Sequence, residues 1–230
     1  MGKDRTFDIF TVLGHDLKSP LNAVDQYLQI IRDKMLGEGI EPYLEIVERS
    51  MARLVQMREL ITDVCDWAKI QSSAMPRSLA MVDLSRAASA VLDGYRKEAQ
   101  RRNITISSDI EDGLAMRASA WEIDLILRHL ISNAVRYNKE GGAVVFRMRR
   151  AGPHIALSVS DTGIGISAEE QTQLFQEFGR IKNRDTQSIK GTGLGLAIVK
   201  ALLDLYQGTI ALESSPGQGT TVSLQLLCAD

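Results

Sequence analysis

Two glycine-rich segments are the first candidates for chemistry in this sequence. "DTGIG" (161–165) and "GTGLGL" (191–196) offer backbone amides that a ligand can approach closely, because glycine has no side chain in the way. The second segment runs directly into the amphipathic "LAIVKALLDLY", and glycine amides at the start of a helix favour an anion such as phosphate. Neither segment has the G-x-G-x-x-G spacing of a dinucleotide turn, and no G-x-x-x-x-G-K-[ST] phosphate loop is present. Taken alone, each is equally consistent with a tight turn.

A third segment, "LRHLISNAVRYN" (127–138), adds polar side chains on a helical pattern. Asn133 and Tyr137 lie one turn apart with Arg136 beside them, and an amide oxygen can bind a hard cation such as Mg²⁺. Between the two glycine segments, two phenylalanines lead into a polar, basic stretch, "LFQEFGRIKNRDTQSIK". Its polarity suits a lid that closes over phosphates, with three candidate contacts: Arg180, Lys182 and Lys190.

The fourth segment, "GHDLKSP" (14–20), places a histidine between two residues that weaken helices. His15 falls next to the apolar seam of its helix, so it is exposed to water, largely neutral at pH 7 and able to act as a nitrogen nucleophile. Asp16 is placed to accept or orient the departing ring proton, and Ser19 lies one turn beyond on the same face. Pro20 removes a backbone hydrogen bond, which predicts a kink near His15.

The element that carries His15 is predicted to be one arm of a helical hairpin. Apolar residues recur every three or four positions from residue 7 to residue 35, and again from 44 to 68. The glycines of "GEGIEP" (37–42) are expected to end the first helix, and Pro42 suits the first turn of the second. A lone hairpin cannot enclose its own seam, so a homodimer with a four-helix bundle is expected.

The remainder of the chain has a different pattern. "QSSAMPRSLAM" (71–81) indicates a linker, and helices are predicted at 84–101 and 120–137. Strands are predicted at 103–110, 143–150, 154–161, 208–215 and 220–227, several of them joined by glycine-rich turns. The fold class is α+β: a helical hairpin (1–72), a linker (73–80) and a two-layer α/β sandwich (81–230).

The composition excludes several classes of partner. A formal net charge of -2 gives no basic field for nucleic acid or an acidic membrane. No apolar run is long enough for a membrane helix, so no direct membrane contact is expected from this segment. The two cysteines are far apart and form no CxxC pair, which fits a reducing, cytoplasmic setting.

At this point a resemblance is plain. The order "SNAVRYN", "DTGIG", "FQEF", "GTGLGLAIVK" resembles the N, G1, F and G2 boxes of sensor histidine kinases, and "HDLKSPL" is similar to the phospho-acceptor motif of the same family. The resemblance covers the whole chain. It implies a dimerisation and phosphotransfer hairpin followed by an ATP-binding domain.

The resemblance also implies roles for individual residues. Asp161, assisted by Thr220, would hold the adenine amine, Asn133 would bind Mg²⁺, and Arg136 and Tyr137 would lie near the phosphates and the nucleotide edge. Gly163 and Gly165 would leave space for the base and ribose. The phosphates would be cradled by the G2 segment: Gly191, Thr192, Gly193, Leu194, Gly195 and Leu196.

His129 departs from the family pattern. It stands four residues before Asn133, where the family usually has a polar amide or an acid, and where related chaperone and gyrase ATPases carry a glutamate that activates water. Two interpretations stay open: a neutral imidazole that binds Mg²⁺ or orients phosphates, and a helix histidine merely tolerated near the pocket. The missing glutamate argues against an ATPase that attacks with water.

The implied reaction moves the γ-phosphoryl group of ATP to His15 and then to an aspartate on the receiver domain of a response regulator. Ser19 matches the position that orients water for dephosphorylation of the regulator, where relatives more often carry threonine or asparagine. One alternative is a degenerate kinase that serves as a dimeric nucleotide- or partner-binding module. A second is a chaperone-like ATPase or protein-serine kinase, against which "HDLKSPL" on a heptad helix argues.

Overall fold

The computed structural model describes residues 3–37, 39–72, 77–176, 179, 181, 186, 189 and 191–227, with side chains from residue 17 onward. The chain divides into two compact units, Met1–Cys65 and Asp66–Asp230. The first unit consists of two helices, and the second is an α/β domain that also includes the last residues of the second helix.

The two helices are α1 (Lys3–Arg32) and α2 (Glu41–Gln71). The expectation that the glycines end the first helix is wrong, because α1 stops earlier. Lys34 adopts a left-handed φ of 49°, its N–H bonds to the carbonyl of Ile31, and the N–H of Met35 bonds to the carbonyl of Ile30. This pair of bonds is a Schellman motif, and here a lysine takes the position that glycine usually holds.

Tyr43 closes the loop between the two helices. Its ring is buried, and its hydroxyl accepts the N–H of Leu36 at 3.0 Å and donates to the carbonyl of Gly37 at 2.7 Å. Few other side chains of the hairpin are buried, notably Val24 and Leu60. Most of the large apolar residues are exposed: Leu21, Leu28, Leu44, Val47, Met51, Leu54, Val55 and Ile61.

The second unit is built on a mixed five-stranded sheet. Its strand order is β2 (Thr105–Ile110), β4 (Ala143–Ala151), β5 (His154–Asp161), β7 (Gly219–Leu227) and β6 (Thr209–Ser215). β2 runs parallel to β4, and the other neighbouring pairs are antiparallel. All five predicted strands are present.

A separate two-stranded sheet pairs β1 (Ala80–Asp83) with β3 (Ala115–Ala118). Neither strand was predicted, because each has only four residues and no clear alternation of apolar and polar positions. β1 begins at Ala80, which the sequence had placed in the linker.

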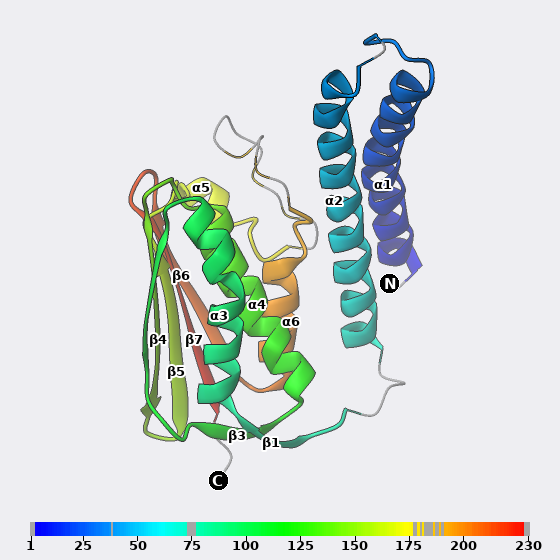
Figure 1. Ribbon diagram of the computed structural model, residues 1–230. Coiled ribbons are helices and arrows are strands. Elements are labelled where there is room, and N and C mark those ends of the chain that lie inside the picture. Colours follow the sequence, from blue (N-terminus) through cyan, green and yellow to red (C-terminus); the bar gives the residue numbers. More distant parts are fainter. Residues whose placement is uncertain are drawn as a thin grey trace. The chain divides into compact units, whose positions relative to one another are not determined.

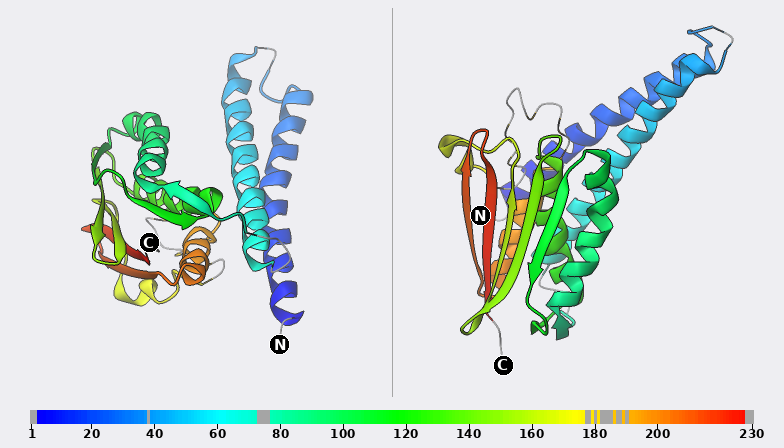
Figure 2. Two further views of the ribbon diagram at one scale, coloured as in Figure 1. Left: turned by 90° about the horizontal axis from the view of Figure 1, so that it is seen from below. Right: turned by 60° about the vertical axis from the view of Figure 1, so that its left-hand side comes forward.

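Helices cover one face of the five-stranded sheet (Figures 1 and 2). They are α3 (Leu84–Arg101), α4 (Ala120–Arg136) and α6 (Gly195–Leu205), and a short α5 (Ala168–Gln171) follows β5. The strand residues that face the helices are buried with them, and each buried large apolar side chain contributes about 1.5–3 kcal/mol. The core between the layers includes Leu92, Ile126, Ile131, Phe146, Met148, Ile155, Ile198 and Leu202. None of the helices in the described residues is long and apolar enough to cross a membrane.

Candidate functional site

The end of α4 carries the polar segment around Asn133 and is held in place by Arg102, the residue that caps α3. The Arg102 guanidinium donates to the carbonyls of Val135 (2.6 Å), Arg136 (3.1 Å) and Asn138 (2.6 Å). The last carbonyls of a helix have no partner within the helix, and a cation there is favoured by the helix dipole. Arg102 therefore fixes the turn that presents Arg136 and Tyr137.

Asn138 joins this turn to the strands behind it. The residue is only 3% exposed, and its amide donates to the carbonyl of Ala143 at 3.0 Å. Its side-chain oxygen accepts from the Thr162 hydroxyl (3.2 Å) and from the N–H of Lys139 (3.0 Å), while Thr162 also accepts the N–H of Ala143. A buried amide satisfied on both sides is a rigid connection between α4 and the segment after β5.

The backbone of "DTGIG" approaches its neighbours closely at two glycines. The N–H of Ile164 bonds to the carbonyl of Tyr137 at 3.1 Å, and a Cβ on Gly163 would collide with that carbonyl. Gly165 has a φ of 67°, and a Cβ there would collide with the carbonyl of Ser215. Contacts within the protein therefore require both glycines, whatever space they also leave for a ligand.

Asp161 ends β5 as a partly exposed carboxyl group. One oxygen, Oδ1, accepts the N–H of Gly163 at 2.8 Å and the N–H of Thr220 at 3.3 Å. Burial raises the pKa of Asp161 to about 6, although these two hydrogen bonds act to lower it. Within the described residues no cation pairs with Asp161 and no hydrogen bond reaches Oδ2, so this oxygen is available to a donor.

Thr220 presents a second acceptor beside Asp161. The Ser214 hydroxyl donates to the carbonyl of Gly219 at 2.9 Å and lies 2.8 Å from the Thr220 hydroxyl. Because a serine hydroxyl has one proton, Thr220 must be the donor in the second bond. Thr220 then offers only lone pairs to a ligand. Together Asp161 and Thr220 match the two hydrogens of an exocyclic amine and disfavour a carbonyl at the same place.

The segment "GTGLGL" meets the end of α4 on the other side. A Cβ on Gly191 would lie 3.3 Å from the Tyr137 hydroxyl and 3.4 Å from Nη1 of Arg136. Leu194, which precedes α6, is fully buried, and its N–H bonds to the Thr192 hydroxyl at 3.2 Å. The structure thus brings "DTGIG" and "GTGLGL" to the end of α4, which is the third of the four segments that the sequence singles out.

His129 lies against Gly195, the first residue of α6. A Cβ on Gly195 would stand 2.9 Å from Nδ1 of His129. The other ring nitrogen, Nε2, is buried and has no hydrogen-bond partner among the described residues. Burial lowers the pKa of His129 to about 4, and the positive charges of Arg128 and Arg136 act in the same direction, so the imidazole is neutral at pH 7.

A metal ion at this site would rely on few protein atoms. The described residues contain no group of three or more His, Cys, Asp and Glu side chains that could hold one. Asn133 is partly exposed on α4, one turn after His129, and its amide oxygen is a suitable ligand. Mg²⁺ commonly binds through one or two protein oxygens, with water and phosphate completing its shell, so these residues fit that ion.

Several predicted site residues cannot be placed in this geometry. Arg180, Lys182 and Lys190 lie outside the described residues, as do the side chains of His15 and Asp16. Ser19 is exposed on α1, and Leu196 lies in the first turn of α6. The sequence prediction did not include Arg102, Asn138 or Ser214. Only Asn138 had a local signal, because it directly follows the predicted helix and precedes a glycine pair.

Two family models match the chain. Residues 8–73 match the His Kinase A (phospho-acceptor) domain, and residues 120–229 match the family described as histidine kinase-, DNA gyrase B- and HSP90-like ATPase. The first range contains His15, and the second contains all three segments that converge on α4.

Curated relatives are similar along most of the chain. The non-motile and phage-resistance protein of Caulobacter vibrioides is 30% identical over 222 residues, which cover 93% of this chain and 26% of that protein. The circadian input-output histidine kinase CikA of Synechococcus elongatus is 31% identical over 220 residues, covering 94% and 29%. The chain thus spans about a quarter of the length of these relatives.

Solved structures share the fold. The Acinetobacter baumannii histidine kinase AdeS superposes with a TM-score of 0.74 at 20% identity, covering 94% of this chain and 98% of that one. The histidine kinase ThkA, solved in complex with the response regulator protein TrrA, gives a TM-score of 0.77 at 17% identity and covers 99% and 64%.

The fold and the site define a class: a phospho-acceptor hairpin followed by an ATP-binding domain of the kind shared by histidine kinases, DNA gyrase B and HSP90. Within that class the two domains occur here in one chain, in the order found in sensor kinases. The chain belongs to the sensor histidine kinases and is their catalytic core.

Proposed function

We propose that this chain is an ATP-dependent protein-histidine autokinase that phosphorylates His15 and passes the phosphoryl group to an aspartate of a response regulator. The observation that carries the proposal is the meeting of the end of α4 with the start of α6, at Gly191 and at Gly195. The start of α6 then serves as an anion-binding helix N-terminus, with Arg136 and His129 close to the glycines that precede and open it. The match of residues 8–73 to a phospho-acceptor domain supplies the acceptor.

The adenine base is held by Asp161 and Thr220. Both present acceptors, which suits the exocyclic amine of adenine and not the carbonyl of guanine. The amides of the segment Gly191–Leu196 receive the phosphates, with Arg136 and Tyr137 alongside. To Arg180, Lys182 and Lys190, which lie outside the described residues, we assign contacts with the triphosphate.

Asn133 would hold Mg²⁺ through its amide oxygen, because this ion prefers oxygen ligands. An ion held there would neutralise negative charge on the phosphoryl group that is transferred. His129 serves the same region through Nε2, a buried atom with no hydrogen-bond partner among the described residues, to which nucleotide, metal or water would supply one.

The phosphotransfer step is a displacement at the γ-phosphorus. A ring nitrogen of His15 attacks, the bond to the ADP oxygen breaks, and Asp16 accepts the proton that leaves the ring. Ser19 lies on the exposed side of α1, where a receiver domain can reach it, and orients water for dephosphorylation of the regulator. The complex of ThkA with TrrA supports the choice of a response regulator as partner.

The working unit is a homodimer, and we assign its domains to a hairpin at 1–72, a linker at 73–80 and a catalytic domain at 81–230. The apolar residues that the hairpin leaves exposed support dimerisation, since a second copy would bury them in a four-helix bundle. A phosphoryl donor of this kind, working with a receiver domain, operates in the cytoplasm.

The test is incubation of the purified chain with Mg²⁺ and γ-labelled ATP. We expect acid-labile label on the wild type and only background label on His15→Gln. The matched control is His154→Gln, which changes a histidine at the start of β5 and should keep full labelling. Free phosphate without labelled protein would show an ATPase instead, and ATP binding without either product would show a nucleotide-binding module.

A further inference from the structure

An ion pair with a buried carboxylate lies at the end of the catalytic domain opposite the nucleotide segments. Glu122 is in the first turn of α4, and its side chain is 6% exposed. Nε and Nη2 of Arg77 donate to its two oxygens at 2.9 and 2.6 Å. Burial raises the pKa of Glu122, but the hydrogen bonds from Arg77 and Tyr206 outweigh this effect and hold the pKa below its usual value. The carboxylate is therefore charged at neutral pH.

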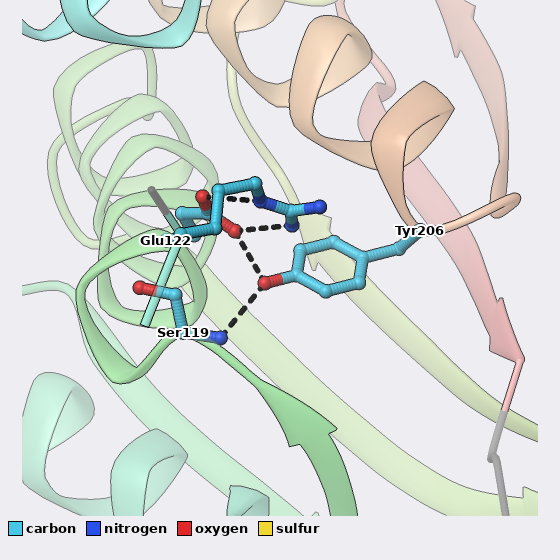
Figure 3. Close-up of polar contacts among 4 residues, drawn as sticks. Ser119, Glu122 and Tyr206 are labelled. Carbon is cyan, nitrogen blue, oxygen red and sulfur yellow. Dashed lines mark hydrogen bonds and ion pairs between the residues drawn. The ribbon is translucent and has the colours of Figure 1, made fainter. Parts of the chain in front are cut away.

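Tyr206 completes the arrangement from a second helix. It follows the last residue of α6, and its hydroxyl donates to Glu122 and accepts the N–H of Ser119 at 2.9 Å. Figure 3 shows this hydroxyl between the Glu122 carboxylate and the backbone nitrogen of Ser119. The Arg77 guanidinium lies over the Tyr206 ring, 4.7 Å from its centre. These four residues, Arg77, Ser119, Glu122 and Tyr206, are called the Arg77 cluster below.

Arg77 differs from the other members of the cluster because it lies outside the helices and strands. It precedes β1, in the linker that joins the phospho-acceptor hairpin to the catalytic domain. A bidentate pair that also stacks on an aromatic ring holds a guanidinium in one place. Such a buried pair contributes little net stability compared with apolar residues of similar volume, so its main effect is to specify a position. Here it specifies where the linker lies on the domain.

The cluster and the nucleotide segments occupy opposite ends of the same two helices. α4 starts at the cluster and ends at Arg136, whereas α6 starts at Gly195 and ends beside Tyr206. At about 1.5 Å per residue, the 11 residues of α6 and the 17 of α4 separate the two ends by roughly 16 to 25 Å. Arg77 cannot touch the nucleotide, but it is fixed to the elements that do.

We propose that Arg77 is a positioning residue for autophosphorylation: by holding the linker on Glu122 and Tyr206, it sets where the catalytic domain is tethered to the hairpin that carries His15. The inference rests on the proposed autokinase function. Transfer requires the γ-phosphate and the histidine ring to meet in a narrow range of geometries. A tether fixed close to α4 and α6 limits the orientations that the domain has to sample.

The test variant must open the cluster without leaving a buried charge. Arg77→Met alone would strand the Glu122 carboxylate, which is strongly destabilising. The double variant Arg77→Met, Glu122→Gln removes both charges and keeps an acceptor for the Tyr206 hydroxyl. Arg96→Met is the matched control, because Arg96 pairs with Asp93 on the exposed face of α3 and its side chain is 52% exposed.

Two measurements on the full chain decide the matter. Autophosphorylation of the double variant at saturating ATP should fall about tenfold, with KM and the Kd for a non-hydrolysable ATP analogue unchanged. A nitroxide on Cys introduced by Ser78→Cys, in a background of Cys65→Ser and Cys228→Ser, should be immobilised in the parent and mobile in the double variant. Arg96→Met should match the parent in both.

A wild-type rate at saturating ATP in the double variant would overturn the proposal, as would a weaker Kd that accounts for the whole loss. Equal nitroxide mobility in parent and variant would also overturn it. The nitroxide result does not depend on phosphotransfer. A parent chain that immobilises the label but acquires no phosphate would refute the autokinase function, and with it the role in catalysis, while leaving the linker contact established.

Discussion

Replacing Asp161 with asparagine should stabilise the nucleotide-free protein and abolish nucleotide binding. The carboxyl group is largely buried, and no cation pairs with it in the described part of the chain. Burial raises its pKa from 3.8 to about 6. The charge that accepts the adenine amine therefore opposes folding when no ligand is present.

The size of the effect follows from that pKa. At about 1.4 kcal/mol for each tenfold change in proton affinity, the interval from 3.8 to about 6 corresponds to about 3 kcal/mol lost at neutral pH. Asparagine carries no charge and keeps an oxygen for the N–H groups of Gly163 and Thr220. Because the group is partly exposed and solvent screens part of the penalty, we expect a gain of about 1–2 kcal/mol in the free energy of unfolding.

The pH dependence provides a second signature. Between pH 3.8 and about 6 the folded state binds more protons than the unfolded state, because the folded pKa of Asp161 is the higher one. Wild-type stability attributable to this group therefore falls as pH rises through that interval and is constant above it. The advantage of Asp161→Asn should be complete above about pH 6 and disappear towards pH 4.

Urea unfolding without nucleotide, at about pH 7.5 and again at about pH 4.5, measures both signatures. Thermal shifts with Mg²⁺ and ATP measure binding, and only the wild type should shift. Asp93→Asn is the control, because this side chain is 68% exposed and its loss should change neither measurement. An Asp161→Asn variant no more stable than wild type at the higher pH would refute the reasoning, as would an advantage at the lower pH that is as large as the advantage at the higher pH.

Four further substitutions test other parts of the structure. Ser214→Ala frees the proton of Thr220, so competition binding should show ATP affinity reduced about fivefold and its preference over GTP narrowed; an unchanged ratio would contradict this. Gly219 has a φ of 89°, and a Cβ there would collide with the carbonyl of Asp161. Gly219→Ala should therefore lower the free energy of unfolding by at least about 2 kcal/mol. Gly94 is exposed within α3, so Gly94→Ala should raise the free energy of unfolding by about 0.5–1 kcal/mol. Urea unfolding of the two glycine variants measures both changes. Leu54→Lys places a charge on the exposed apolar face of α2 and should shift the mass measured by light scattering from dimer to monomer; an unchanged mass would argue against dimerisation through this face.

The elements with strong periodicity could be predicted from the sequence. α3 and the five strands of the large sheet depend on the alternation of their own residues, and the predicted helix at 84–101 has the bounds observed for α3. The end of α1 could not, because Lys34 takes the left-handed conformation that the prediction reserved for glycine. The short strands β1 and β3 depend on pairing with each other, and four residues give no pattern to detect.

The candidate site also has parts that the sequence predicts and parts that it does not. Its glycine segments have recognisable local motifs, whereas the residues that hold them depend on distant partners. Arg102 bonds to carbonyls 33 to 36 positions ahead, and Tyr206 bonds to a carboxylate 84 positions back. Nothing in the neighbourhood of either residue indicates such a partner. Sequence motifs therefore indicate the candidate ligand-binding segments better than the residues that hold those segments in place.

The strand order has a consequence for how the enzyme is made. β7 is the last strand in the sequence, yet it lies between β5 and β6 and supplies Thr220 and Gly219 to the wall around Asp161. On the ribosome, β5 and β6 emerge first and cannot complete the sheet between them. This wall, the proposed site of the base, can form only after β7 has left the exit tunnel, by which time the phospho-acceptor hairpin has long been synthesised. A nascent chain is thus unable to use ATP until all the strands of its catalytic domain are available, and truncations within β7 should be inactive from synthesis onward.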